Sequence, residues 1–225
     1  MFTIIRGFLA LAIASQVLLA GATTAFAQTD ITCISALSRQ TVQNVIVPQG
    51  ATCSLTDMTV LGNVEVKELG NVTIRRGSVN GDVIAEAGAT ARLVAGRISG
   101  GVVGLGARLI NINATSIAID VTADQTASVV VGNGARAGSI EVLKGGSANI
   151  SGVRLTGSLK FEENRGAITA ASNIVAGNFE AFLNQGRLTF NSNTITGNMQ
   201  CKENRLAPTG SGNTAASKED QCATL

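Results

Sequence analysis

A phrase of five residues returns at a nearly constant interval through most of this chain, and this repetition constrains the fold more than any other feature. The phrase ends in Gly-Asn-Val at residues 62–64, in Gly-Asp-Val at 81–83 and in Gly-Asn-Met at 197–199. The centres of eight successive phrases stand at Gly62, Gly81, Gly100, Ile119, Gly138, Gly157, Gly177 and Gly197. Self-similarity at a fixed interval, here about 19–20 residues, is typical of solenoids, in which each repeat stacks on its neighbours. The sequence therefore predicts a solenoid.

Apolar residues stand two positions apart within each repeat, which indicates strands rather than helices. One such pair is Val64 and Val66, a second is Val72 and Ile74, and the equivalent positions of later repeats are also mostly apolar. Strands stacked about 4.8 Å apart would form a rod of about 40 Å from about nine coils. We therefore expect an all-β, single-domain parallel β-helix, with its coils in residues 44–201.

The two flanking segments, 28–43 and 202–225, do not follow the repeat. We expect them to cap the rod, because open sheet edges recruit other chains. Ile34 to Asn44 is interpreted as a short helix, and the C-terminal tail as a polar loop.

Glycine and asparagine gather at the expected corners of the coils. One corner is shared by Gly77, Gly96, Gly134, Asn173 and Asn193. We expect left-handed backbone there, because Gly and Asn adopt it most easily. A second column contains Asn164, Asn184 and Asn204, one in each of three successive repeats, which predicts a hydrogen-bonded ladder from coil to coil.

The first 27 residues are typical of a secretory signal peptide. Arg6 precedes an apolar run from Gly7 to Ala20, and Ala25-Phe26-Ala27 fits the small-x-small cleavage rule. We therefore expect residues 28–225 to be exported, to the periplasm or the extracellular medium. No later segment approaches 18 uninterrupted apolar residues, so we expect no stable membrane insertion of the mature chain.

Four cysteines lie near the ends of the chain, at Cys33, Cys53, Cys201 and Cys222. Export makes disulfides the default state. Three pairings are possible, and the layout favours Cys33 with Cys53 and Cys201 with Cys222. The chain has no histidine and no CxxC spacing, so we expect no metal site.

Charge and composition argue against several function classes. Without Arg6 the chain keeps 16 Lys/Arg against 15 Asp/Glu and shows no basic cluster, so we expect no nucleic-acid binding. The absence of histidine excludes Ser-His-Asp and Cys-His catalysis. No motif predicts a cofactor.

Two sets of outward residues remain as candidate sites. Glu141 and Glu180 fall two coils apart, about 9.6 Å by strand spacing, which is near the upper limit for the carboxylates of an inverting glycosidase. The alternative is a surface ladder with Lys160 between them. A flat polar row for glycan or lattice binding would consist of Thr73, Asn111, Asn149, Thr169 and Thr189, with Arg92 and Val130 interrupting it.

The C-terminal segment carries a series of distinctive motifs: Gly197 to Asn204, Ala207-Pro208-Thr209-Gly210 and Gln221-Cys222. Together with Val47 to Cys53, they resemble a family of secreted bacterial β-helix proteins. The resemblance implies a right-handed parallel β-helix with a C-terminal disulfide cap, and it implies no catalytic residue. The Gly-[Asn/Asp]-Val repeats alone are also similar to bactofilins, which are cytoskeletal β-helices, whereas export and disulfides favour the secreted proteins.

These observations favour an exported, non-enzymatic structural or interaction protein. Its partner would be an envelope polysaccharide or a protein. The alternatives are a polysaccharide lyase or glycoside hydrolase acting near Glu141 and Glu180, and glycan or lattice (ice-like) binding through the Thr/Asn row.

Overall fold

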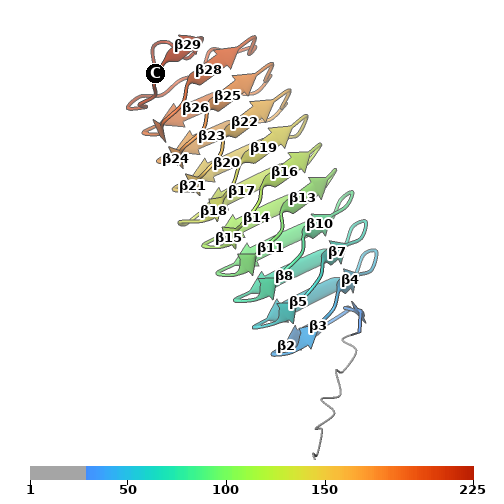
Figure 1. Ribbon diagram of the computed structural model, residues 1–225. Helices are drawn as coiled ribbons and strands as arrows, with labels where there is room; N and C mark the ends of the chain where they lie inside the picture. Colours follow the sequence, from blue (N-terminus) through green and yellow to red (C-terminus); the bar gives the residue numbers. More distant parts are fainter. Residues whose placement is uncertain (1–28) are drawn as a thin grey trace, which may run out of the picture.

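The computed structural model describes residues 29–225, and the predicted signal peptide lies outside the described residues. The chain winds into a rod of stacked coils, with the strands of successive coils side by side (Figure 1). Every strand pairing is parallel, and the strands form three sheets, here named A, B and C. The predicted all-β parallel solenoid is confirmed, with about ten coils rather than about nine.

The strands of each sheet follow one another along the rod. Sheet A contains β1 (Ile31–Thr32), β4 (Val45–Val47), β7 (Val64–Val66), β10 (Val83–Ala85), β13 (Val102–Leu105), β16 (Val121–Asp124), β19 (Ile140–Leu143), β22 (Leu159–Glu162), β25 (Phe179–Phe182), β28 (Met199–Lys202) and β29 (Lys218–Asp220). Sheet B contains β2 (Ala36–Ser38), β5 (Thr52–Thr56), β8 (Asn71–Arg75), β11 (Thr90–Val94), β14 (Leu109–Asn113), β17 (Ser128–Gly132), β20 (Ser147–Ser151), β23 (Ile168–Ala171) and β26 (Leu188–Asn191). Sheet C contains β3 (Thr41–Val42), β6 (Thr59–Val60), β9 (Ser78–Val79), β12 (Arg97–Ile98), β15 (Ser116–Ile117), β18 (Arg136–Ala137), β21 (Arg154–Leu155), β24 (Ile174–Val175) and β27 (Thr194–Ile195).

The helix predicted for Ile34 to Asn44 is wrong, because this segment contains strands β2 and β3. Leu37 and Val42 turn inward, with Val42 buried and Leu37 packed against the core, whereas Ile34 is exposed. The first coil is shorter than the others, since Ile31 pairs with Val45 and Leu37 with Leu55. The regular interval between repeats therefore does not reveal this coil in the sequence.

The tail at the other end also continues the stack, in place of the predicted polar loop. Thr209 and Thr214 bridge to the preceding coil, at Thr189 and Thr194. Strand β29 then pairs with β28. Both ends of the rod are therefore covered by shortened or irregular coils.

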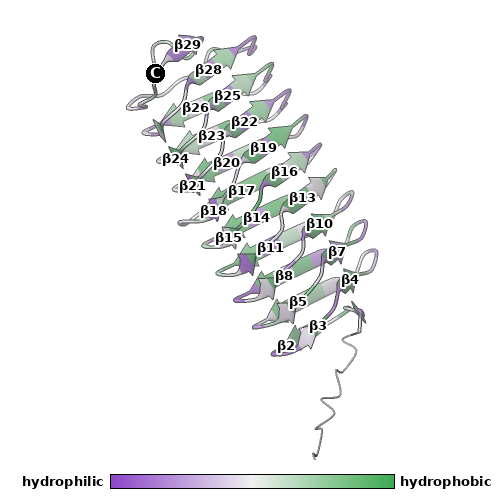
Figure 2. Ribbon diagram, viewed as in Figure 1, coloured by the Kyte–Doolittle hydropathy of each residue, from purple (hydrophilic) through white to green (hydrophobic). Residues whose placement is uncertain are grey.

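The core fills the space between the three sheets. Figure 2 shows the apolar residues concentrated on the strands and many hydrophilic ones at the turns. In the C-terminal half, Phe161, Phe179 and Phe190 are fully buried, and the Phe179 and Phe190 rings meet edge to face with centroids 4.7 Å apart. All three stand at inward positions of their strands, β22, β25 and β26.

The glycine of the repeated phrase is explained by a side chain in the preceding coil. The Asn44 Oδ1 accepts a hydrogen bond from the backbone N–H of Asn63, whose own Oδ1 accepts one from Asp82. A Cβ on Gly62 would lie 2.0 Å from the Asn44 Oδ1, and one on Gly81 would lie 2.0 Å from the Asn63 Oδ1. Only glycine leaves room for these acceptors.

The predicted asparagine ladder is confirmed and is buried. The Asn164 Nδ2 donates to the Asn184 Oδ1, and the Asn184 Nδ2 donates to the Asn204 Oδ1, both at 3.0 Å. A second buried ladder is formed in the same way by Asn173, Asn193 and Asn213. Each ladder replaces apolar core at one corner with fully bonded amides.

The backbone prediction for the Gly/Asn corner is wrong at four of its five positions. The positive φ angles fall one residue earlier, at Arg76, Ala95, Ser172 and Ser192, and only Gly134 has one itself. The residues after these positions turn inward instead. Asn173 and Asn193 place their amides in the ladder there, and Gly77 leaves space for Ile74, whose Cγ2 would lie 2.9 Å from an added Cβ.

Candidate functional site

Sheet A brings Glu141, Lys160 and Glu180 into register on its outer face. Lys160 in β22 pairs with Glu141 of β19 on one side and with Glu180 of β25 on the other. The Lys160 Nζ lies 2.7 Å from the Glu162 Oε2. This hydrogen bond raises the pKa of Lys160, and the charges of Glu180 and Glu141 raise it further. The two candidate carboxylates thus flank a cation instead of facing an open space.

The same face carries a second ion-paired lysine nearer the N-terminus. The Lys67 Nζ lies 2.8 Å from the Glu86 Oε1 and 2.9 Å from the Glu65 Oε2. Hydrogen bonds to Glu86 and Glu65 raise the pKa of Lys67 to about 12. Charges on sheet A therefore pair with their neighbours along the surface.

The Thr/Asn candidates share one outward column on sheet B. In register along this column stand Thr73, Arg92, Asn111, Val130, Asn149, Thr169 and Thr189. Thr209 continues the column through a bridge to Thr189, so threonines occupy three successive coils at the C-terminal end. Val130 interrupts this polar column with an apolar side chain, and Arg92 interrupts it with an exposed charged side chain.

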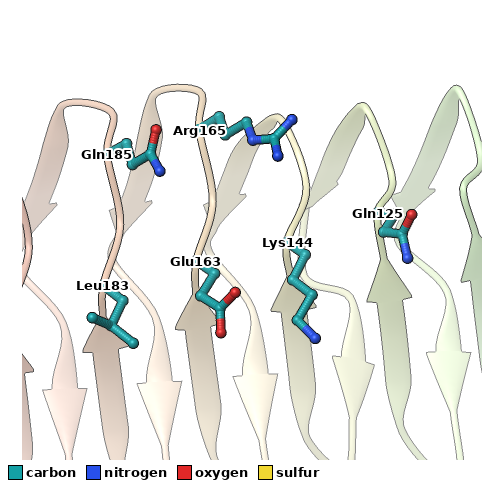
Figure 3. A pocket seen from close by; sticks show the side chains of 6 residues that line it. All are labelled: Gln125, Lys144, Glu163, Arg165, Leu183 and Gln185. Carbon is teal, nitrogen blue, oxygen red and sulfur yellow. The ribbon is translucent and has the colours of Figure 1, made fainter.

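A depression of about 610 Å³ lies along the corner between sheets A and B, lined by Gln125, Lys144, Glu163, Arg165, Leu183 and Gln185 (Figure 3). Four of these residues have positive φ angles and occupy the same corner of successive coils: Gln125, Lys144, Glu163 and Leu183. The depression holds one carboxylate beside two cations, whereas glycoside hydrolysis requires two carboxyl groups. Neither Glu141 nor Glu180 lines it.

Sheet C presents a row of arginines that the sequence analysis missed. Arg97, Arg136 and Arg154 occupy its outward column, with Ser116 between the first two. In the part of the chain that the structure describes, no carboxylate lies within 4.0 Å of any of these three guanidinium groups. By contrast, Arg76 binds Asp57 at 2.8 Å.

Two disulfides close the ends of the rod, with the pairing that the layout favours. Cys33 is bonded to Cys53, with their Cα atoms 5.6 Å apart, and Cys201 to Cys222, with theirs 5.1 Å apart. All four cysteines are buried. Two such disulfides point to an oxidising, extracytoplasmic compartment.

Within residues 29–225, no group of three or more His, Cys, Asp or Glu side chains is arranged to hold a metal ion. The same residues contain no helix of the length and apolarity that a membrane span requires.

No protein-family profile, curated protein or solved structure matches this chain. The parallel solenoid is thus established by its own geometry. The resemblance of its C-terminal motifs to secreted bacterial β-helix proteins stays a prediction.

Proposed function

We propose that this chain is an exported, non-enzymatic rod that presents rows of side chains to a partner in the cell envelope or outside the cell. The partner would be an envelope polysaccharide or a protein. Right-handed coils and a place among secreted bacterial β-helix proteins are part of this proposal, and they rest on the C-terminal motifs. Both disulfides suit either the periplasm or the extracellular medium.

One observation carries the proposal: the candidate carboxylates do not converge on a common space. Glu141 and Glu180 are separated by Lys160, and Glu163 is the single carboxylate that lines the corner depression. A glycosidase pair needs an acid and a base or nucleophile on the two sides of one bond. The ion pairs on sheet A instead favour a surface whose side chains are fixed by their neighbours.

A second candidate function is glycan or lattice binding through sheet B. Thr169, Thr189 and Thr209 stand on three successive coils at the strand spacing. A regular row of hydroxyl groups on a flat face is suited to an ordered surface of repeating groups. Arg92 and Val130 confine such a face to the C-terminal half.

The test is to incubate residues 28–225 with a panel of cell-wall and acidic polysaccharides and to record both retention and newly released reducing or unsaturated ends. We expect retention without released product. Product that disappears in Glu141→Gln or Glu180→Gln would establish the lyase or hydrolase alternative and overturn the proposal. Retention that is lost in Thr169→Lys/Thr189→Lys would assign binding to sheet B.

A further inference from the structure

The arginine row on sheet C is a concentration of unpaired positive charge on a β-sheet face. Arg136 in β18 and Arg154 in β21 are direct neighbours, about 4.8 Å apart by strand spacing, and both are exposed. Like charges directly opposite each other in a sheet destabilise it. Arg97 lies two strands further along, about 9.6 Å from Arg136.

Within residues 29–225, no acidic group relieves this repulsion by an ion pair. Asp82 and Asp120 lie in the turns that lead from sheet C to sheet A. Each uses an Oδ1 to accept a backbone N–H, from Gly101 and Ser139 respectively. Elsewhere on the surface of residues 29–225, Lys67, Arg76 and Lys160 have carboxylate partners, whereas other exposed arginines such as Arg92 have none. The row is distinguished by Arg136 and Arg154, which are direct neighbours on adjacent strands.

A local change of register creates the row. The step in sheet C from Ser116 to Arg136 is one residue longer than the regular interval, and the step from Arg136 to Arg154 is one residue shorter. The regular interval would have placed Ala135 in the outward position. The shift leaves Ala137 in the inward column, where the other coils place Val, Ile or Leu. The coil that turns Arg136 outward therefore has a smaller apolar side chain, that of Ala137, in the core.

Two shallow hollows adjoin the row and meet at Arg136. One, of about 210 Å³, is lined by Arg97, Ser116 and Ala118 among others, and the second, of about 190 Å³, by Gly134, Gly152 and Arg154. Small residues are part of the lining of both hollows, so the guanidinium groups project beside open space. The hydroxyl group of Ser116 lies between two of the cations in the column.

We propose that this row, Arg97 to Arg154 on sheet C, binds a linear polysaccharide that carries carboxylate groups, with its chain lying along the rod. The guanidinium fork matches a carboxylate in bidentate geometry. Because several such groups stand in one row, they favour carboxylates spaced along a polymer over a single small anion. The Ser116 hydroxyl and the shallow hollows fit sugar rings and their hydroxyl groups. This inference rests on the proposed binding function and names its partner class.

The experiment measures affinity for polygalacturonate by calorimetry, at about 25 mM and about 300 mM salt, for the wild type and for Arg136→Gln/Arg154→Gln. We expect the double variant to bind at least about tenfold more weakly, because two charge-assisted contacts are removed. Arg187→Gln/Arg205→Gln is the matched control, since it removes the same charge from exposed positions away from sheet C. We expect the control to change affinity less than about twofold.

Further arms identify the chemistry that is bound. Fully methyl-esterified polygalacturonate keeps the sugar backbone and masks the carboxylates, so we expect it not to bind. Equal loss in both double variants, binding of the ester, or no binding of polygalacturonate at low salt would each overturn the inference. Tighter binding of polyphosphate than of polygalacturonate would overturn the carboxylate assignment. Released product would contradict the non-enzymatic function alone, and circular dichroism verifies that each variant is folded.

Discussion

At the residue scale, the identity of each phrase glycine depends on the side chain in the coil before it. The rule is tested within the chain by its exception. Gly101 has no side chain and therefore supplies no acceptor, and the next phrase has Ile119 in place of glycine, with its side chain half exposed. Where the acceptor returns at Asp120, the following phrase again has glycine, at Gly138, and a Cβ there would lie 2.4 Å from the Asp120 Oδ1. Acceptor and glycine thus form one two-coil unit.

This unit predicts a destabilising substitution with a defined rescue. In Gly157→Ala the new Cβ would lie 2.2 Å from the Ser139 Oγ, whereas the nearest backbone atom is 3.1 Å away. We expect a loss of about 1–3 kcal/mol in the free energy of unfolding, measured by urea denaturation. Ser139→Gly in the same chain should recover more than half of it, because it recreates the Gly101–Ile119 arrangement. Additive losses in the double variant would show that the clash with Ser139 is not the cause.

At the element scale, the buried ladders hold the corners of the last coils. Asn184→Ala removes the acceptor for both the N–H and the Nδ2 of Asn164 and the donor to the Phe161 carbonyl oxygen, all in buried positions. We expect a loss of about 3 kcal/mol in chemical denaturation, because buried groups are left without partners. Asn178→Ala is the control: Asn178 also accepts a backbone N–H from the next coil, at 3.0 Å, but it is exposed. Its loss should stay below about 1 kcal/mol, since water replaces the bond, and equal losses would contradict the role of burial.

The element scale also shows what the sequence could and could not predict. Sheets A and B were predictable because each of their strands from β4 to β28 carries two inward residues, such as Val64 and Val66, and so shows alternation. Sheet C was missed because its strands have two residues and only one of them, such as Val60, points inward. The inward residues of most sheet C strands nevertheless stand in the sequence as the first residues of the repeated phrase.

The candidate surfaces were predictable to the extent that the regular interval between repeats holds. Glu141 and Glu180 follow it and lie where the repeat places them. Arg136 does not, because the longer and the shorter step around it cancel and leave the overall spacing intact. When the repeats are aligned without gaps, Arg136 falls at the same position as the inward Ile117. The arginine row becomes visible only in the pairing of the strands, which the spacing of residues in the sequence does not give.

At the scale of the whole molecule, the rod is a one-dimensional stack in which each coil contacts only its neighbours. Stability in such a stack is the sum of terms within coils and between adjacent coils, and the end coils, with one neighbour, open first. The disulfides lie at these ends: Cys33–Cys53 joins the first coil to the second, and Cys201–Cys222 joins β28 to the segment after β29. Each closes a loop of about 20 residues and stabilises the end by about 3 kcal/mol.

This position predicts that reduction loosens the rod from its ends instead of unfolding it uniformly. Under a phosphine reductant in native buffer, amide hydrogen exchange should accelerate at least about tenfold in β1, β2, β28 and β29, which corresponds to a local loss above about 1.4 kcal/mol. Exchange in the central strands β14 and β17 should stay within about twofold, because several coils separate them from either disulfide. Cys201→Ala/Cys222→Ala should reproduce the change at β28 and β29 and leave β1 and β2 as in the oxidised wild type. Uniform acceleration along the whole chain would mean that the rod unfolds as one cooperative unit, and the one-dimensional description would then be wrong.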